Sequence, residues 1–168
     1  MMQWSVHVCD VLTEPADVLV CSANPYLNLS GGVGGEILRR YGEGMQKELH
    51  AHLAARQVRF VPPGAVVQTS PGGTHFRAVL HAVAIDAFYA SSPELVRRTV
   101  ETALELAASL NAKRVALVAL ATGYGPMSIQ QFGKSVAPLR HLEFPPIESV
   151  IICVRRAEQR SQLEALSS

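Results

Sequence analysis

Short runs of apolar residues alternate along this chain with longer segments in which apolar side chains recur every three or four positions. The short runs are rich in valine and leucine, and turn residues bound them, which favours strands. The run from Arg114 to Leu120 is apolar at nearly every position and is typical of a strand covered on both faces. The expected strands are Trp4–Cys9, Asp17–Cys21, Ala65–Thr69, Arg77–Ala84, Arg114–Leu120 and Val150–Val154.

The segments with helical spacing lie between these strands. The clearest helix begins at Ser92-Pro93-Glu94 and runs to Leu110, because it combines a cap residue, a proline at the first helical position and an early acid. Another predicted helix, Ser128–Leu142, contains Pro138, which either ends or kinks it. The remaining predicted helices are Gly34–Tyr41, Met45–Arg56 and Ala157–Leu166.

Alternating strands and helices predict an α/β fold in which helices cover both faces of a mostly parallel sheet. The 168 residues suit one domain, because a chain of this length buries most of its apolar surface in a single core. No segment resembles an interdomain linker. We therefore expect one domain over residues 1–168.

Composition and charge exclude several classes of protein. With 48% apolar residues, 17% charged residues and a net charge of +1, the chain is typical of a globular protein and presents no broad basic surface for nucleic acid. No apolar run approaches the roughly 18 residues of a membrane span. The amino terminus lacks the pattern of a secretory signal. We expect a cytoplasmic protein with no membrane partner.

The cysteines and histidines form no metal-binding pattern in the sequence. Cys9, Cys21 and Cys153 are odd in number and lie in apolar strand-like runs, which predicts buried free thiols in a reducing compartment. The six histidines are scattered, so a zinc site would require residues distant in sequence to converge in the fold. We expect neither a metal nor a cofactor.

Two glycine-bearing loops carry the candidate chemistry. Asn24–Gly35 and Ala121–Gly125 each follow a predicted strand and precede a helix-like segment. Glycine allows close approach of a ligand to the backbone, and the N–H groups at a helix N-terminus favour anions. The carboxyl ends of parallel strands share one edge of a sheet. The two loops therefore predict a single cleft that binds a diphosphate.

The two loops match neither of two familiar phosphate-binding fingerprints in full. The triphosphatase pattern G-x-x-x-x-G-K-[ST] fails, because neither loop offers a lysine followed by serine or threonine. The dinucleotide pattern G-x-G-x-x-G is approached by Gly123–Ser128, although a serine replaces the last glycine and Pro126 intrudes. Arg155 follows the last predicted strand and is a candidate partner for the 2′-phosphate of NADP. An NAD(P)-dependent oxidoreductase is thus a minor alternative for the function.

Read together, the motifs resemble those of the macrodomain family, which binds ADP-ribose. Cys9-Asp10-Val11 is similar to the family's Gly-Asp-Ile, and Asp17–Asn24 to its Asp-Ala-Ile-Val-Asn-Ala-Ala-Asn. Ser30–Gly35 and Ala121–Gly125 resemble its two phosphate loops, and His81-Ala82-Val83 resembles a central-strand motif. The resemblance spans most of the chain. It implies a three-layer α/β/α sandwich around a mixed, mostly parallel sheet.

The resemblance also implies a role for each candidate binding residue. Asp10, beside Val11, would accept the adenine amine, Arg155 would stack on adenine, and Asn24 would bind the distal ribose. Ordinary structural roles are the alternatives: a cap for Asp10, an exposed strand-end arginine, and a turn asparagine before Pro25. Tyr124 would cover the diphosphate or distal ribose, or pack on the domain edge. The backbone of the loops would bind the phosphates through Gly31, Gly32, Val33, Gly34, Ala121, Thr122, Gly123, Tyr124 and Gly125.

One departure from the family bears on catalysis. Gly34 occupies the position where the family's hydrolases carry an acid, and Glu36, two helical positions on, is expected to point elsewhere. The main prediction is therefore a protein that binds ADP-ribose, free or attached to a protein or nucleic acid. The alternative is an ADP-ribosyl hydrolase or O-acetyl-ADP-ribose deacetylase in which a substrate phosphate activates water. Asn24 would then be the catalytic candidate that positions it.

Overall fold

The computed structural model describes residues 1–123 and 125–166. Its described strands form a six-stranded sheet in the order β1-β6-β5-β2-β4-β3. Every neighbouring pair is parallel except β3 and β4, which are antiparallel. The sheet is therefore mixed and mostly parallel, as predicted. The strands are β1 (Gln3–Val8), β2 (Val18–Ser22), β3 (Val66–Thr69), β4 (Ala78–Ala82), β5 (Arg114–Val118) and β6 (Ser149–Val154).

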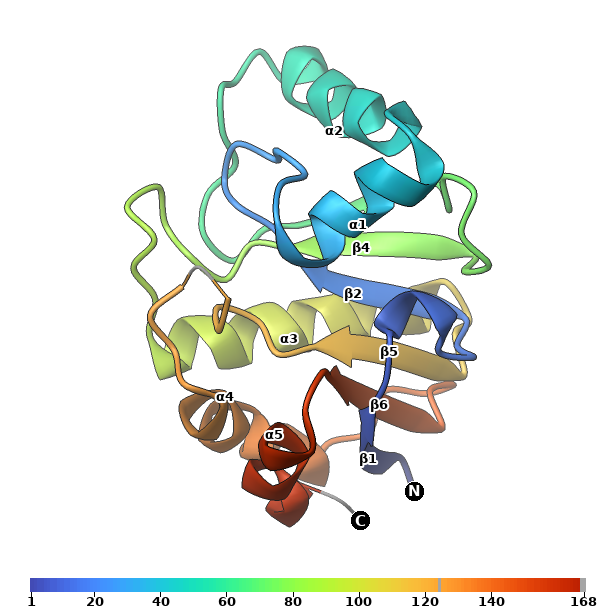
Figure 1. The fold of residues 1–168 in the computed structure, drawn as a ribbon, viewed down its shortest axis with the longest axis vertical. Coiled ribbons are helices and arrows are strands. Elements are labelled where there is room, and N and C mark those ends of the chain that lie inside the picture. Colours follow the sequence, from blue (N-terminus) through green and yellow to red (C-terminus); the bar gives the residue numbers. More distant parts are fainter. Residues whose placement is uncertain (124, 167–168) are drawn as a thin grey trace.

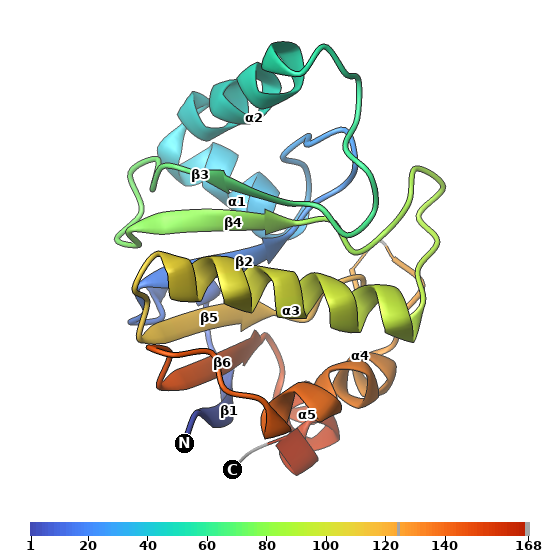
Figure 2. The same cartoon turned by 180° about the vertical axis from the view of Figure 1, so that it is seen from behind.

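Helices cover both faces of this sheet, which confirms the three-layer α/β/α fold. Figure 1 shows α1 in front of the sheet with α2 above it, and Figure 2, from behind, shows α3 crossing the opposite face. Helices α4 and α5 lie on the α3 side, near β6 and β1. The α-helices are α1 (Gly32–Tyr41), α2 (Gly44–Ala55), α3 (Pro93–Ser109), α4 (Ile129–Val136) and α5 (Ala157–Gln162). Short 3₁₀ turns are η1 (Val11–Thr13), η2 (Ala137–His141) and η3 (Glu164–Leu166).

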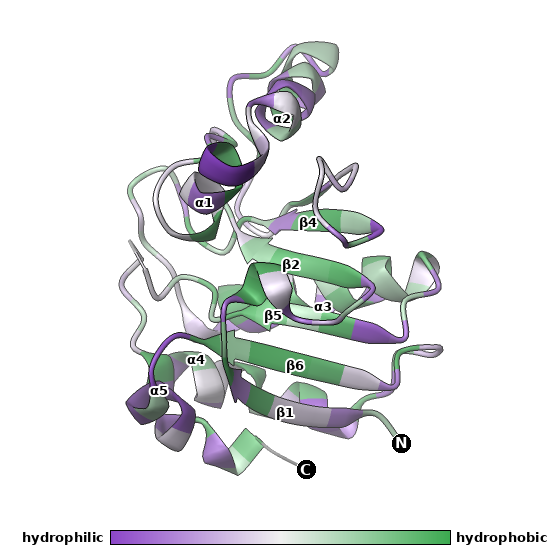
Figure 3. Ribbon diagram, turned by 45° about the vertical axis from the view of Figure 1, so that its right-hand side comes forward, coloured by the Kyte–Doolittle hydropathy of each residue, from purple (hydrophilic) through white to green (hydrophobic). Residues whose placement is uncertain are grey.

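Two apolar clusters fill the spaces between the layers. In β2, Val18 and Val20 face the α3 side while Leu19 and Cys21 face α1 and α2, because successive side chains of a strand point to opposite faces. Both sets are fully buried. The central strands consequently read as continuous apolar runs, and Figure 3 shows them as hydrophobic ribbons inside more polar helices.

In the carboxyl-terminal third, the structure shows that Pro138 ends one predicted α-helix, and it corrects the bounds of another. The α-helix predicted over Ser128–Leu142 ends at Val136, and a 3₁₀ turn continues past Pro138, whose ring and missing N–H break the α-helical ladder. The predicted helix Ala157–Leu166 ends at Gln162 and is followed by a separate 3₁₀ turn. A Cβ on Gly133 would lie 2.8 Å from Leu163 Cδ2. Glycine at this position therefore allows the carboxyl-terminal segment to pack closely against α4.

The cysteine prediction also needs correction. Cys21 and Cys153 are buried, but Cys9 is only partly so, because it follows β1 at the edge of the sheet. Within the described part of the chain, no helix combines the length and apolarity needed to cross a bilayer.

Candidate functional site

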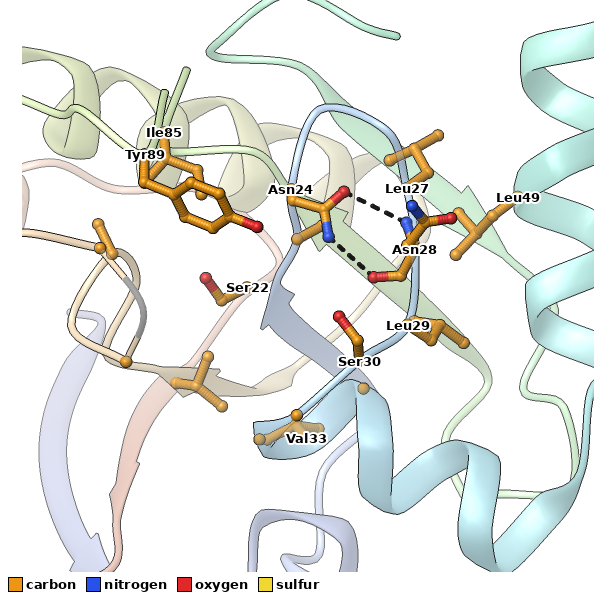
Figure 4. Close-up of a pocket in the computed structure, with 18 residues that line it drawn as sticks. Ser22, Asn24, Leu27, Asn28, Leu29, Ser30, Val33, Leu49, Ile85 and Tyr89 are labelled. Atoms are coloured by element: carbon orange, nitrogen blue, oxygen red, sulfur yellow. Dashed lines mark hydrogen bonds between the residues drawn. The ribbon is translucent and has the colours of Figure 1, made fainter. Parts of the chain in front are cut away.

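A cavity of about 590 Å³ lies where the two glycine loops meet beyond the carboxyl ends of β2 and β5. The first loop contributes residues from Asn24 to Gly34, and the second contributes Ala121, Gly123 and Gly125. Ile85 and Tyr89, from the connection between β4 and α3, line it as well. Figure 4 shows these loops around the cavity. The single cleft expected from a parallel sheet is therefore present.

The first loop ends in an uncapped helix N-terminus. Helix α1 begins at Gly32, two residues earlier than predicted. Its N-cap is Gly31, which has no side chain to cap the helix. The Gly35 N–H donates to the Gly31 carbonyl at 2.8 Å, which closes the first helical turn. The N–H groups of the preceding residues, from Gly32 to Gly34, have no acceptor within the helix. This end of α1 therefore carries partial positive charge and suits an anion.

The second loop brings two stretches of backbone very close together. Ala121 adopts a left-handed φ of 63°, and its carbonyl accepts a hydrogen bond from Met127 N–H at 3.1 Å. A Cβ on Gly125 would lie 2.8 Å from the Ala121 carbonyl carbon, so only glycine fits here. Thr122 is not among the lining residues and donates to the Ala119 carbonyl at 2.6 Å. Tyr124, the predicted cover, lies outside the described residues.

Asn24 holds the first loop in shape. Its Nδ2 donates to the Asn28 carbonyl at 2.9 Å, and its Oδ1 accepts from Asn28 N–H at 3.3 Å (Figure 4). Helix α2 supports the same loop, because Gln46 accepts from Leu29 N–H at 2.6 Å and donates to the Leu27 carbonyl at 2.8 Å. One amide hydrogen and one acceptor site of Asn24 remain for a ligand.

Asp10 lies outside the residues that line the cavity, as do Val11 and Arg155. Its Oδ1 accepts from Leu12 N–H at 3.1 Å and so caps η1, and its Oδ2 pairs with Arg40 Nη2 at 2.7 Å. Burial opposes ionisation of this carboxyl, but the hydrogen bonds from Arg40 and Leu12 N–H and the nearby charge of Arg155 outweigh it, so the pKa of Asp10 lies below its usual value. Asp10 is thus an ionised cap held by an arginine.

The sequence interpretation missed Tyr89. This half-exposed side chain lines the cavity, and Figure 4 shows its ring directed towards Asn24. Its backbone has a left-handed φ of 62°, in a turn where Asp86 accepts hydrogen bonds from the N–H groups of Phe88 and Ala90 at 2.8 and 2.9 Å. Its position in the chain could have indicated it, because the loop that carries Tyr89 follows a parallel strand and lies at the same sheet edge as the glycine loops.

Acidic side chains are absent from the described lining of the cavity. Gly34 lies in the first turn of α1 and is buried. Glu36 is engaged elsewhere, since it accepts from Arg39 Nη2 at 2.8 Å and from Arg40 Nε at 3.1 Å. The described site therefore offers backbone donors and amide groups rather than a general base.

Comparison with known proteins agrees with this fold. The Macro domain family model matches residues 20–135. A Macro domain-containing protein of Streptomyces nogalater is 36% identical over 115 residues, covering 68% of this chain and 64% of that protein. An uncharacterized protein of Aquifex aeolicus is 33% identical over 82% of this chain and 81% of its own length. Some relatives are longer, and the match covers 33% of an uncharacterized Mycobacterium tuberculosis protein.

Solved structures resemble the whole described fold. The Trypanosoma brucei macrodomain in complex with ADP-ribose superposes with a TM-score of 0.81 at 18% identity, covering 97% of this chain and 68% of that one. The Oceanobacillus iheyensis macrodomain with ADP gives a TM-score of 0.83 at 20% identity, covering 95% and 87%.

Proposed function

The chain belongs to the macrodomain family, and on that premise we propose that it binds ADP-ribose in the cavity between its two glycine loops. The diphosphate lies against the N-terminus of α1 and the backbone of the second loop. Support comes from the ligands of the similar structures, ADP-ribose in one and ADP in the other. The uncapped first turn of α1, opening into a cavity of about 590 Å³, is the observation that carries the proposal.

The two ends of the ligand are assigned to Asn24, which lines the cavity, and to Asp10 and Arg155, which lie outside its lining. Asp10 accepts the adenine amine, and Arg155, exposed at the end of β6, stacks on the base. Asn24 uses its spare amide hydrogen and acceptor site on the distal ribose, across the cavity from Tyr89. The backbone N–H groups of Thr122, Gly123 and Gly125 also bind the phosphates, and Tyr124 remains the predicted cover of the diphosphate or distal ribose.

Recognition rather than cleavage is the activity we propose. Hydrolysis of an ADP-ribosyl bond requires a group that deprotonates or orients water, and the described lining provides no carboxylate for this. The partner is then an ADP-ribosylated macromolecule whose terminal ADP-ribose enters the cavity. We place this recognition in the cytoplasm. The hydrolase alternative depends on a phosphate of the substrate to activate water.

Calorimetric titration of the purified chain with ADP-ribose and with GDP-ribose tests the proposal. We expect saturable binding of ADP-ribose and weaker binding of GDP-ribose, because Asp10 accepts a hydrogen bond that guanine does not donate from the same position. Asp10→Asn should reduce this preference, while Glu105→Gln, at an exposed carboxylate of α3, should leave it unchanged. No heat and no thermal stabilisation with ADP-ribose would overturn the assignment.

A release assay with ADP-ribosylated protein separates recognition from hydrolysis. We expect the modified protein to bind without loss of its ADP-ribose. Release that continues at the same rate in Asn24→Ala would contradict the site proposed here, and release that depends on Asn24 would support the hydrolase alternative.

A further inference from the structure

Cys9 and Glu14, which follow β1, meet Cys153 from the far end of the sequence. The Sγ atoms of Cys9 and Cys153 and a carboxylate oxygen of Glu14 all lie within 4.8 Å of one another. Cys153 is in β6 and pairs in register with His7 of β1. Since residues two apart on a strand share a face, His7, Cys9 and Cys153 point to the same side of the sheet. The chain continues after β1 through η1 to Glu14, whose carboxylate lies near both sulfur atoms.

A fourth candidate donor lies beside the cluster. The Nδ1 atom of His7 lies 3.0 Å from Glu14 Oε1. Two thiols and one carboxylate are thus clustered, and one imidazole contacts the carboxylate. Tetrahedral zinc, with bonds of about 2.0–2.3 Å, holds its ligand atoms roughly 3.3–3.8 Å apart. The donor atoms of Cys9, Glu14 and Cys153 lie at most 4.8 Å apart, so zinc binding would draw any wider pair together to this spacing.

Burial and charge also suit a bound cation. The side chain of Glu14 is only 7% exposed, and Arg114 Nη2 lies 3.8 Å from its Oε1. Cysteine binds a metal ion as the thiolate, so the thiol protons of Cys9 and Cys153 leave to solvent when a divalent ion binds. Two thiolates and one carboxylate around it leave one net negative charge, which Arg114 balances.

We propose that Cys9, Glu14 and Cys153 form a site for a zinc ion, and that the His7 side chain, which pairs with Glu14, reorients to supply a fourth, tetrahedral ligand. Sulfur and nitrogen donors favour zinc over calcium or magnesium, which prefer oxygen ligands. None of the four residues lines the cavity between the glycine loops, although Cys9 and Cys153 are close in sequence to Asp10 and Arg155, the proposed adenine contacts. The ion ties β1, β6 and the segment ending at Glu14 together and is structural.

Metal titration of the reduced, metal-stripped chain tests this proposal independently of ADP-ribose. Cobalt(II) is the probe, because its tetrahedral thiolate complexes absorb strongly in the near ultraviolet. We expect one equivalent of cobalt to produce thiolate-to-cobalt absorption, zinc to displace it, and zinc to raise the thermal midpoint. Cys9→Ser and Cys153→Ser should each weaken the band, and the double variant should abolish it.

Matched variants show whether the four residues act together. His7→Ala should alter the cobalt spectrum and weaken zinc binding about tenfold or more, whereas His52→Ala, on α2, should change neither. Cys21→Ala keeps both proposed cysteine ligands and should retain the band, and circular dichroism of each variant verifies folding. Absence of the band in the folded parent overturns the proposal. So does a band that survives in the Cys9→Ser, Cys153→Ser double variant.

Discussion

The backbone at Gly31 makes a sharp prediction about the first loop. This residue has φ 60° and ψ 170°, a conformation that is essentially restricted to glycine. Four residues later, Gly35 has ordinary helical geometry, and a Cβ there would meet its nearest atom, the carbonyl carbon of Ser30, at 3.8 Å. Gly31→Ala and Gly35→Ala therefore add the same methyl group to a strained and to an unstrained position.

The size of each effect follows from the backbone geometry. Forcing alanine into the Gly31 conformation costs about 1–3 kcal/mol, which either destabilises the fold or moves the loop and weakens ligand binding. If the loop moves, the loss of affinity is roughly 5–150-fold. Gly35→Ala should instead stabilise α1 by about 0.5–1 kcal/mol and leave ADP-ribose affinity unchanged, because Gly35 does not line the cavity.

Chemical denaturation and ADP-ribose titration of both variants measure these effects. For Gly31→Ala, we expect the losses in unfolding and binding free energy to add to about 1–3 kcal/mol. If Gly31→Ala equals the parent in both stability and affinity, the reasoning about the first loop is refuted. Equal losses in Gly31→Ala and Gly35→Ala would refute it as well.

Three further predictions concern stability and the site. Burial lowers the pKa of His81 to about 4, so the stability that the neutral ring provides is complete above about pH 6.5 and is lost as the pH falls towards 4, by about 3 kcal/mol in total. About 2 kcal/mol of this is lost between pH 7 and pH 5, so urea titrations at these two pH values should show that difference in the parent and less of it in His81→Gln. Phe132→Ala, in the core beside α3, should cost about 3–5 kcal/mol of unfolding free energy, and a midpoint like the parent's would contradict its burial. Asn24→Ala removes both bonds to Asn28 and should lower stability by about 1–3 kcal/mol as well as ADP-ribose affinity, whereas unchanged affinity would remove Asn24 from the site.

Most of the layer structure could be predicted because the central strands are buried on both faces. Val18 to Cys21 must be apolar at every position, and that pattern is visible without any structure. The glycine loops were visible for a related reason, since each follows such a strand and faces the same sheet edge. Boundaries were less certain where local rules compete, as at Pro138, where a 3₁₀ turn replaces the predicted α-helix.

The remaining features depend on contacts that sequence patterns do not encode. The pairing of Asp10 with Arg40 joins the end of β1 to α1, and Tyr89 reaches the cavity through a turn with no periodic signal. Cys9 and Cys153 come together only because β1 and β6 are neighbours, although they are the first and last strands of the chain. Each of these requires strand order, which a single sequence does not specify.

A crystal structure of the chain soaked with ADP-ribose tests the central claim most directly. We expect density for the diphosphate between the first turn of α1, Gly32 to Gly34, and the second loop at Gly123 and Gly125. The adenine should point towards Asp10 and the distal ribose towards Asn24. ADP-ribose bound elsewhere on the surface, or lying in this cavity with its phosphates away from the N-terminus of α1, would contradict the account.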